Sequence, residues 1–161
     1  MRKETRKEER VVVSNYTVYI ANDGTEFDSE RACERHEICT EIDRTEKEVE
    51  DIRIPFCAAP LNYDGYADEE HCEWYKVNNE NDYLKLIAYY RARTVNEVDI
   101  DEPSTYPSVI CVSGDDAWTA PYEIENAYGY TLDDMKKIAE GFFAYFGIKV
   151  KFENMKEGEK V

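Results

Sequence analysis

The sequence predicts a single α+β domain, with a mixed or antiparallel sheet and about three helices. Segments in which apolar and polar residues alternate, as in half-buried strands, are interspersed with segments of helical spacing. This apolar periodicity recurs from residue 11 to residue 152 without an obvious linker, and 161 residues suffice for one sizeable core. We therefore expect a charged tail at residues 1–10 and one domain over residues 11–161.

The domain is predicted to open with a strand, a turn and a helix. Residues 11–20 are rich in β-branched and aromatic residues, and Asn22-Asp23-Gly24 supplies the turn because Asn and Gly tolerate positive φ. Asp28 or Ser29 can cap the helix that follows. The positions of this helix that we expect to face inward are Ala32, His36, Cys39 and Ile42.

The middle of the chain is predicted to hold a helix break, two strands and a second helix. Thr45 and Glu48 have the spacing of a capping box, which predicts a break and a restart there. Residues 54–56, Ile-Pro-Phe, are expected to form a short edge strand, because proline cannot donate to a ladder. A strand is predicted over residues 73–77, and a helix from about Asp82 to Arg93 that is apolar over much of its circumference.

The last third begins with predicted strands. Residues 108–112 form a nearly continuous apolar run, which indicates a buried strand. Ser-Gly-Asp-Asp at residues 113–116 is expected to turn the chain, and residues 119–124 to form a further strand.

A helix and a final strand close the predicted domain. Thr131 is expected to cap the helix, and Gly147 to end it. Residues 148–152 alternate between apolar residues and lysine, which predicts a half-exposed strand. The apolar stripe of the helix consists of Leu132, Met135, Ile138, Ala139, Phe142 and Phe146.

The net charge of −16 is distributed along the chain. The first ten residues carry +2, and residues 11–60, 61–100 and 101–161 carry −7, −5 and −6. Such a field repels nucleic acid and anionic membranes and attracts basic partners, although it also keeps a protein soluble. No apolar run approaches the roughly 20 residues of a membrane span. We expect a basic protein as partner, with no direct binding of nucleic acid or membrane.

The cysteines predict a reducing compartment. There are five of them, and no secretory signal precedes the first strand, so we expect reduced thiols and a cytoplasmic location. Cys33-x-x-His36-x-x-Cys39 has the residue types of a metal site. On a helix, however, residues six apart lie about 240° round the axis, so these three side chains cannot converge on one ion. A structural zinc would need a more distant ligand, such as Cys57, His71 or Cys72.

No catalytic residue, metal or cofactor is assigned from the sequence. No nucleophile elbow surrounds Cys72, Cys111 or any serine, and no phosphate-binding loop is present. The Gly-Asp-Asp turn follows a strand, where carboxylates for Mg²⁺ or Ca²⁺ often lie, but a surface turn is the favoured interpretation. A small metal-dependent enzyme that uses Asp115 and Asp116, or the Cys/His set, stays open as an alternative.

Two clusters combine aromatic side chains with carboxylates. Tyr and Trp serve as anchors in interfaces, and carboxylates steer a protein toward a basic partner. The alternative is cross-strand aromatic packing with a solvated acidic rim. The candidate partner-binding residues are Tyr66, Asp68, Glu69, Glu70 and Glu73 in the first cluster, and Asp115, Asp116, Trp118, Glu123 and Glu125 in the second.

Residues 17–37, TVYIANDGTEFDSERACERHE, resemble the opening of small acidic proteins common in phages and prophages of Gram-positive bacteria. The shared features are an aromatic strand, an Asp-Gly turn, a Glu-Phe pair and a short acidic helix with one cysteine. Residues 74–84, WYKVNNENDYL, have the same character, and together the two segments cover about a quarter of the chain. The resemblance carries no catalytic motif. It implies an accessory phage protein that acts on the machinery of the bacterial host.

Charge and resemblance together predict a non-catalytic protein that binds and inhibits a basic host protein. The resemblance implies a nucleic-acid-handling defence enzyme as target, either a CRISPR nuclease or a restriction system. A mimic of duplex DNA would be the extreme form, and would need the carboxylates to cluster on one face. The remaining alternative is a structural or assembly module of a phage particle.

Overall fold

The computed structural model describes residues 15–55 and 70–152, apart from the side chains of Glu70 and His71. Contacts divide the chain into two units, residues 1–37 and residues 38–161. Helices and a mixed sheet are both present, so the predicted α+β class is confirmed.

The first unit contains a short hairpin and the beginning of a helix. Strands β1 (Tyr19–Ile20) and β2 (Glu26–Phe27) pair antiparallel across the predicted Asp-Gly turn, in which Gly24 has a φ of 88°. The strand expected over residues 11–20 is confirmed only at its end, since residues 15–18 lie outside any strand and residues 11–14 outside the described part.

Helix α1 (Glu30–Val49) is continuous through the predicted break. The prediction at Thr45 is wrong because its hydroxyl donates to the carbonyl oxygens of Glu41 and Ile42, 2.8 and 3.1 Å away, and so bonds back into the helix instead of capping a new one. Arg44 also pairs with Glu41 and with Glu48, which supports the helix across the same turn.

The inward face predicted for α1 is only partly correct. Ile42 is buried and His36 half-buried, but Ala32 and Cys39 are exposed, and Cys33 is buried instead. Most residues of this helix are charged or polar. Its few apolar residues are therefore not enough to predict from their spacing which face is buried.

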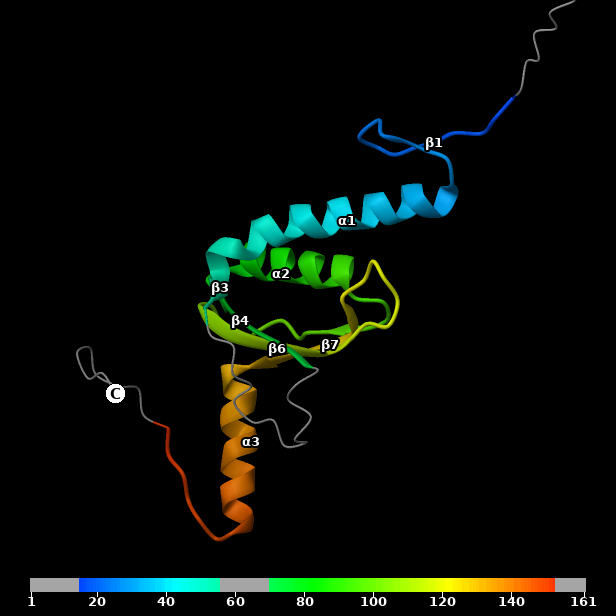
Figure 1. The fold of residues 1–161 in the computed structure, drawn as a ribbon. Coiled ribbons are helices and arrows are strands. Elements are labelled where there is room, and N and C mark those ends of the chain that lie inside the picture. The colour runs from blue at the N-terminus through cyan, green and yellow to red at the C-terminus, as the bar shows by residue number, and fades with distance from the viewer. Residues whose placement is uncertain (1–14, 56–69, 153–161) are drawn as a thin grey trace, which may run out of the picture. The chain divides into compact units, whose positions relative to one another are not determined.

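The second unit is built on a five-stranded sheet with the order β3-β4-β6-β7-β5 (Figure 1). All neighbouring strands are antiparallel except β5 and β7, which makes the sheet mixed. The edge strand predicted over residues 54–56 is confirmed only at Ile54, because β3 ends there, Pro55 lies outside it and Phe56 lies outside the described residues. The strands are β3 (Arg53–Ile54), β4 (Glu70–Val77), β5 (Val98–Asp99), β6 (Ser108–Asp116) and β7 (Ile124–Thr131).

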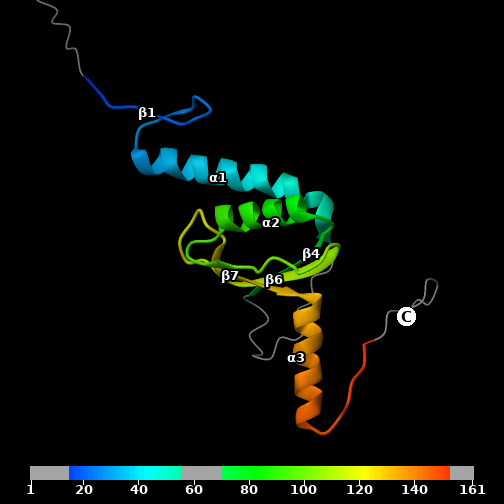
Figure 2. The ribbon, with the colours of Figure 1, turned by 180° about the vertical axis from the view of Figure 1, so that it is seen from behind.

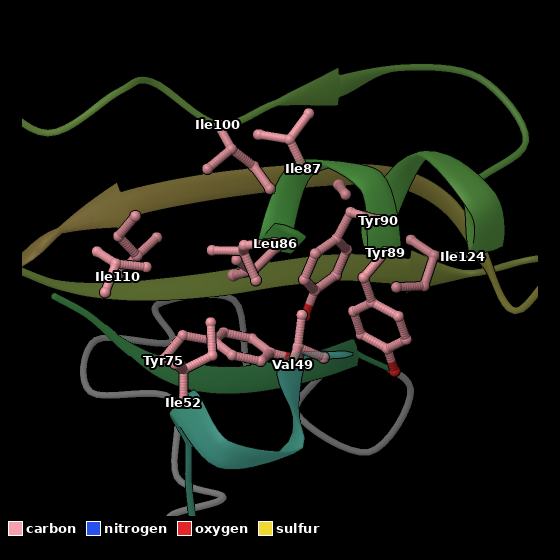
Figure 3. Packing of buried hydrophobic residues seen from close by; sticks show 13 residues of the cluster. Val49, Ile52, Tyr75, Leu86, Ile87, Tyr89, Tyr90, Ile100, Ile110 and Ile124 are labelled. Atoms are coloured by element: carbon pink, nitrogen blue, oxygen red, sulfur yellow. The ribbon is translucent and has the colours of Figure 1, made fainter. Parts of the chain in front are cut away.

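Helix α2 (Glu80–Arg93) covers one face of this sheet and confirms the helix predicted from Asp82 to Arg93. Asn79 caps it by accepting a 3.1 Å hydrogen bond from the backbone of Asp82. In Figure 3, Leu86, Tyr89 and Tyr90 point from α2 toward the strands. The buried cluster also includes Val49, Ile52, Tyr75, Val77, Ile87, Ile100, Ile110, Val112, Ile124 and Ala127.

The β6–β7 region differs from the prediction in two places. Residues 113–116 do not form a turn, because β6 continues to Asp116. Residues 119–124 do not form a strand, because β7 begins only at Ile124. Instead, residues 117–123 connect the strands, closed by a 3.0 Å bond from Ala117 N to Glu123 O. We call this connection the β6–β7 tip.

Helix α3 (Leu132–Tyr145) starts where β7 ends and extends away from the sheet in both views (Figures 1 and 2). The predicted cap is confirmed: Thr131 Oγ1 accepts from Asp134 N, and the Asp134 carboxylate accepts from Thr131 N, both at 3.2 Å. Gly147 has a φ of 74°, as expected for the residue that ends a helix. Residues 148–152 form no strand, because no described strand lies beside them to complete a ladder.

Candidate protein-binding surface

The acidic residues are concentrated in one stretch of the chain. Residues 94–135, which we call the acidic segment, contain ten carboxylates and no lysine or arginine, so they contribute −10 to the total of −16. This segment includes β5, β6 and β7, which are adjacent in the sheet. The order of the strands therefore places in one part of the sheet carboxylates that are up to 26 positions apart, from Asp99 in β5 to Glu125 in β7.

The path of β6 into the β6–β7 tip depends on Gly114. A Cβ atom at this position would lie 2.5 Å from Asn126 O and 2.7 Å from Ile124 Cγ2, so a larger residue would push the two strands apart. The register shifts between Gly114 and Asp116, as in a β-bulge, which re-aims nearby side chains and increases the twist. The close approach at Gly114 and the bulge that follows it therefore determine the path of the backbone at Asp115 and Asp116.

The β6–β7 tip presents one large aromatic side chain to solvent. Trp118 is 94% exposed, the most exposed of the large apolar side chains in the described residues. A hydrogen bond from Tyr122 N to Thr119 O, 3.2 Å long, closes the turn behind it. Because this indole is almost entirely exposed to solvent, it does not pack into the core of the chain. Cross-strand aromatic packing therefore does not explain the presence of Trp118.

Carboxylates surround this tryptophan in the sequence and in the hairpin. Asp115 and Asp116 are exposed at the end of β6. Glu123 Oε2 lies 2.6 Å from Arg93 Nη2, and Glu125 Oε1 accepts a 2.7 Å hydrogen bond from Asn96. The two glutamates are therefore anchored by their neighbours, and the two aspartates are exposed at the end of the strand.

Glu73 has a different role from the one predicted by its position in the first cluster. Its Oε2 accepts from Tyr90, Tyr75 and Arg93 Nη1 at 2.8, 2.9 and 2.7 Å, and its Oε1 lies 3.7 Å from Arg53. The side chain of Glu73 is 23% exposed and that of Arg93 only 5%. We call Glu73, Tyr75, Tyr89, Tyr90, Arg53 and Arg93 the Glu73 network. Its contacts hold the Glu73 side chain within the fold, so this residue is not available to a partner.

Electrostatics hold the Glu73 network in one protonation state. Burial opposes ionisation of Glu73, but Arg93, the Tyr90 hydroxyl and Arg53 outweigh it and keep the pKa of the carboxyl below its ordinary value. Burial raises the pKa of Tyr89 to about 12 and also raises the pKa of Tyr90 well above its ordinary value. The tyrosines therefore stay protonated as donors at neutral pH, and the network serves to fix α2 against β4.

Three other members of the first cluster, Tyr66, Asp68 and Glu69, lie outside the described residues, as does the side chain of Glu70. Of the candidate partner-binding residues, the structure brings together those of the second cluster. The sequence analysis missed Arg93, which fixes both Glu73 and Glu123. A signal existed: Arg93 follows Tyr89 by four residues on the same helix face, and their 4.8 Å cation–π contact follows from that spacing.

The cysteines and histidines proposed as alternative metal ligands do not form a metal site in the part of the chain that is described. There, no group of three His, Cys, Asp or Glu side chains could hold an ion. His36 Nε2 instead lies 2.8 Å from Asp23 Oδ2, within the first unit. Cys72 and Cys111, on β4 and β6, approach to 3.5 Å between sulfurs without forming a disulfide. Cys57 lies outside the described residues.

Comparison with known proteins adds no relative: no family model, curated protein or solved structure matches the chain. Among the described helices, none combines the length and the apolar character that crossing a bilayer requires.

Proposed function

We propose that this chain is a non-catalytic, phage-type acidic protein that docks on a basic surface of a nucleic-acid-handling protein in the host cytoplasm and blocks it. A CRISPR nuclease or a restriction enzyme fits this description. The observation that supports the proposal most is the exposure of Trp118 at the tip of a hairpin whose strands belong to the acidic segment.

The β6–β7 tip and the adjoining end of β6 together have the two properties that a docking surface for a basic protein needs. An exposed indole can fill an apolar pocket on the partner and slow dissociation. Carboxylates at the end of β6 attract lysine and arginine from a distance, which speeds association. Because the acidic segment contains no base, nothing within it offsets this attraction.

The experiment begins with capture. The purified protein is immobilised and exposed to a nuclease-treated lysate of a Gram-positive host, and the retained protein is identified and purified. We expect a basic, nucleic-acid-binding protein, whose activity falls when this chain is added in stoichiometric amount.

Kinetics with the captured partner then test the surface. Asp115→Lys with Asp116→Lys should lower the association rate about tenfold at low salt, and the difference should shrink as salt screens it. Trp118→Ala should raise the dissociation rate about tenfold while leaving the association rate unchanged.

The control is the double variant Glu30→Lys, Glu34→Lys, which changes the net charge by the same amount on α1. Its effect on association should be clearly smaller. An acidic partner would rule the proposal out, and so would binding that is indifferent to salt, to the Asp115/Asp116 double variant and to Trp118→Ala.

A further inference from the structure

Two cysteine side chains meet across the sheet of the second unit. Cys72 lies on β4 and Cys111 on β6, and their Sγ atoms are 3.5 Å apart. The two residues are 39 positions apart in the sequence, so the pairing of the strands is what brings them together. Neither sulfur is part of a disulfide. The pair is therefore a dithiol whose two sulfurs are already neighbours.

The strand ladder fixes this contact. Eight consecutive residue pairs join β4 and β6. Cys111 is paired with Trp74. Cys72 is paired with Ser113, two positions further along β6, so the two cysteines are diagonal neighbours. A register that extends over this length keeps the two sulfurs close, because a slip would turn every side chain to the other face.

The two cysteines lie on the face of the sheet opposite α2. Successive side chains of a strand point to opposite faces. Tyr75 and Ile110 belong to the buried cluster beneath α2 (Figure 3). Cys111 follows Ile110 directly, and Cys72 is three positions from Tyr75, so both point to the other face. A bond between their sulfurs therefore leaves the cluster that holds α2 unchanged.

The two thiols differ in access and in acidity. Cys72 is half-buried, whereas Cys111 is only 3% exposed. Burial raises the pKa of the Cys111 thiol well above its ordinary value. Because the thiolate is the reactive form, the buried sulfur is a poor first nucleophile. A reagent that arrives from solvent therefore meets Cys72 first.

We propose that Cys72 and Cys111 form a redox-sensitive pair, which closes to a reversible disulfide when a small-molecule disulfide reaches Cys72. The Cys72 thiolate attacks one sulfur of this oxidant, RSSR, breaks its S–S bond and releases RS⁻. Cys111 Sγ then attacks Cys72 Sγ in the mixed disulfide and displaces the second RS⁻. The two cysteines lose two electrons and two protons in total, and RSSR takes them up to become two RSH.

Proximity favours this second step over persistence of the mixed disulfide. A disulfide has about 2.05 Å between its sulfurs, so the two Sγ atoms have to approach by about 1.5 Å. Paired strands hold both sulfurs in place, which gives Cys111 an effective concentration far above that of a thiol in solution. The mixed disulfide is therefore expected to be short-lived.

The diagonal placement predicts a bond that is easily reduced. In an antiparallel pair, the Cβ atoms of diagonal neighbours lie farther apart than those of residues directly opposite each other. A disulfide prefers Cβ atoms about 3.8 Å apart, so closure draws the strands together and stores strain. Strained disulfides are more readily reduced and are typical of regulatory pairs. In a reducing compartment the pair therefore stays a dithiol until an oxidant accumulates.

The remaining cysteines define the controls. Cys33 and Cys39 both belong to α1, outside the ladder. Because Cys39 is exposed, it can link two molecules, so all test proteins carry Cys39→Ser. Cys33 is buried and is replaced by Ala in a matched control. Cys57 lies outside the described residues and is kept, so that a bond to it can be detected.

Thiol counting and peptide mapping of the full-length Cys39→Ser protein test the proposal. The protein is incubated with oxidised glutathione, denatured and alkylated. The number of free thiols should fall from four to two, with the loss of two hydrogen atoms and no retained glutathione. Mapping should find the peptide with Cys72 linked to the peptide with Cys111. Dithiothreitol should restore both thiols without denaturant.

Three variants of this protein separate the two steps. In Cys111→Ala, Cys72 should retain glutathione, because no second sulfur displaces it. In Cys72→Ala, the loss of thiols should be about tenfold slower, because the buried Cys111 reacts poorly from solvent. Cys33→Ala should lose two thiols at the unchanged rate. Circular dichroism checks that each variant is folded, and the mapping itself needs none of them.

A count that stays at four would overturn the inference, and so would glutathione that stays on Cys72 while Cys111 is present. A bond between Cys72 and Cys57 would overturn the choice of pair. A disulfide that resists dithiothreitol in the folded protein would overturn its reversibility. No partner protein enters these measurements, so this inference and the proposed docking function succeed or fail independently.

Discussion

Glu73 is the residue on which the interior polar contacts of the second unit converge. Its carboxylate accepts from two tyrosine hydroxyls and from the almost fully buried guanidinium of Arg93. The other terminal nitrogen of Arg93 pairs with Glu123. A charge buried as deeply as that of Arg93 needs a partner, because removing one member of a buried pair leaves the other uncompensated. Glu73 therefore stabilises the position of α2 against β4 by pairing with Arg93.

Replacing Glu73 by Gln should therefore destabilise the fold. The free energy of unfolding is expected to fall by about 2 kcal/mol, less than for fully buried pairs, because Glu123 continues to pair with Arg93. Denaturant unfolding followed by circular dichroism measures the change. Glu125→Gln, whose amide oxygen can still accept from Asn96, serves as the control and should stay within about 0.5 kcal/mol of the wild type. Equal losses in the two variants would show that Glu73 has no special role.

The difference in unfolding free energy between the wild type and Glu73→Gln should depend on pH. The pKa of Glu73 is lower in the folded state than its ordinary value of 4.5, so ionised Glu73 stabilises the fold above that pH. As pH falls below 4.5 and through the folded pKa, Glu73 is protonated and this stability is lost. The difference in unfolding free energy between wild type and Glu73→Gln should accordingly be largest near pH 7 and shrink toward pH 3. A difference that stays constant over this range would contradict the assignment.

At the scale of elements, two glycines show how differently the chain uses this residue. Gly114 lies in β6 where the backbone and a side chain of β7 leave no room for a Cβ atom. Gly141 lies within α3, and an added Cβ there would meet nothing within 4 Å. One glycine is required by close approach, and the other only lowers the stability of a helix.

Alanine substitution should therefore have opposite signs at the two positions. Gly114→Ala is expected to destabilise the fold by about 1–3 kcal/mol, because the added methyl group forces β6 and β7 apart. Gly141→Ala should stabilise it by about 0.5–1 kcal/mol through helix propensity. Thermal and denaturant unfolding measure both. A loss of stability at Gly141 as large as that at Gly114 would mean that the α3 backbone is also closely packed.

For the whole molecule, the distribution of charge along the chain decides where a basic partner is attracted, and the net charge alone does not. The acidic segment, residues 94–135, holds ten carboxylates and no base, while residues 136–152 hold four lysines and one carboxylate. A partner approaching the sheet therefore meets a strongly negative field.

The isolated protein should not bind DNA or RNA appreciably at physiological salt. Phosphate contacts would have to overcome the repulsion of a molecule with a net charge of −16, and Lys136 and Lys137 on α3 are already paired with Asp133 and Asp134. Gel-shift or fluorescence-anisotropy measurements with submicromolar protein and labelled duplex or single strand test this. A shift under these conditions would refute the prediction, and with it the expectation that the target is a protein.

The sequence by itself determined the features that depend on neighbours along the chain. The Asp-Gly turn, the strand at residues 73–77, helix α2 and the cap at Thr131 all follow from local spacing and side-chain chemistry, and all are present. The acidic character of the candidate surface was equally readable, since charge is a property of composition.

Only the tertiary structure decided the roles of the individual acidic and aromatic residues. Glu73 and Asp115 look alike in the sequence, yet one is bound by Arg93 from α2 and the other is exposed at the end of β6. Trp118 could have packed across a sheet, but β7 begins too late to shelter it. Burial and pairing depend on which elements become neighbours in space, and local sequence patterns carry no such information.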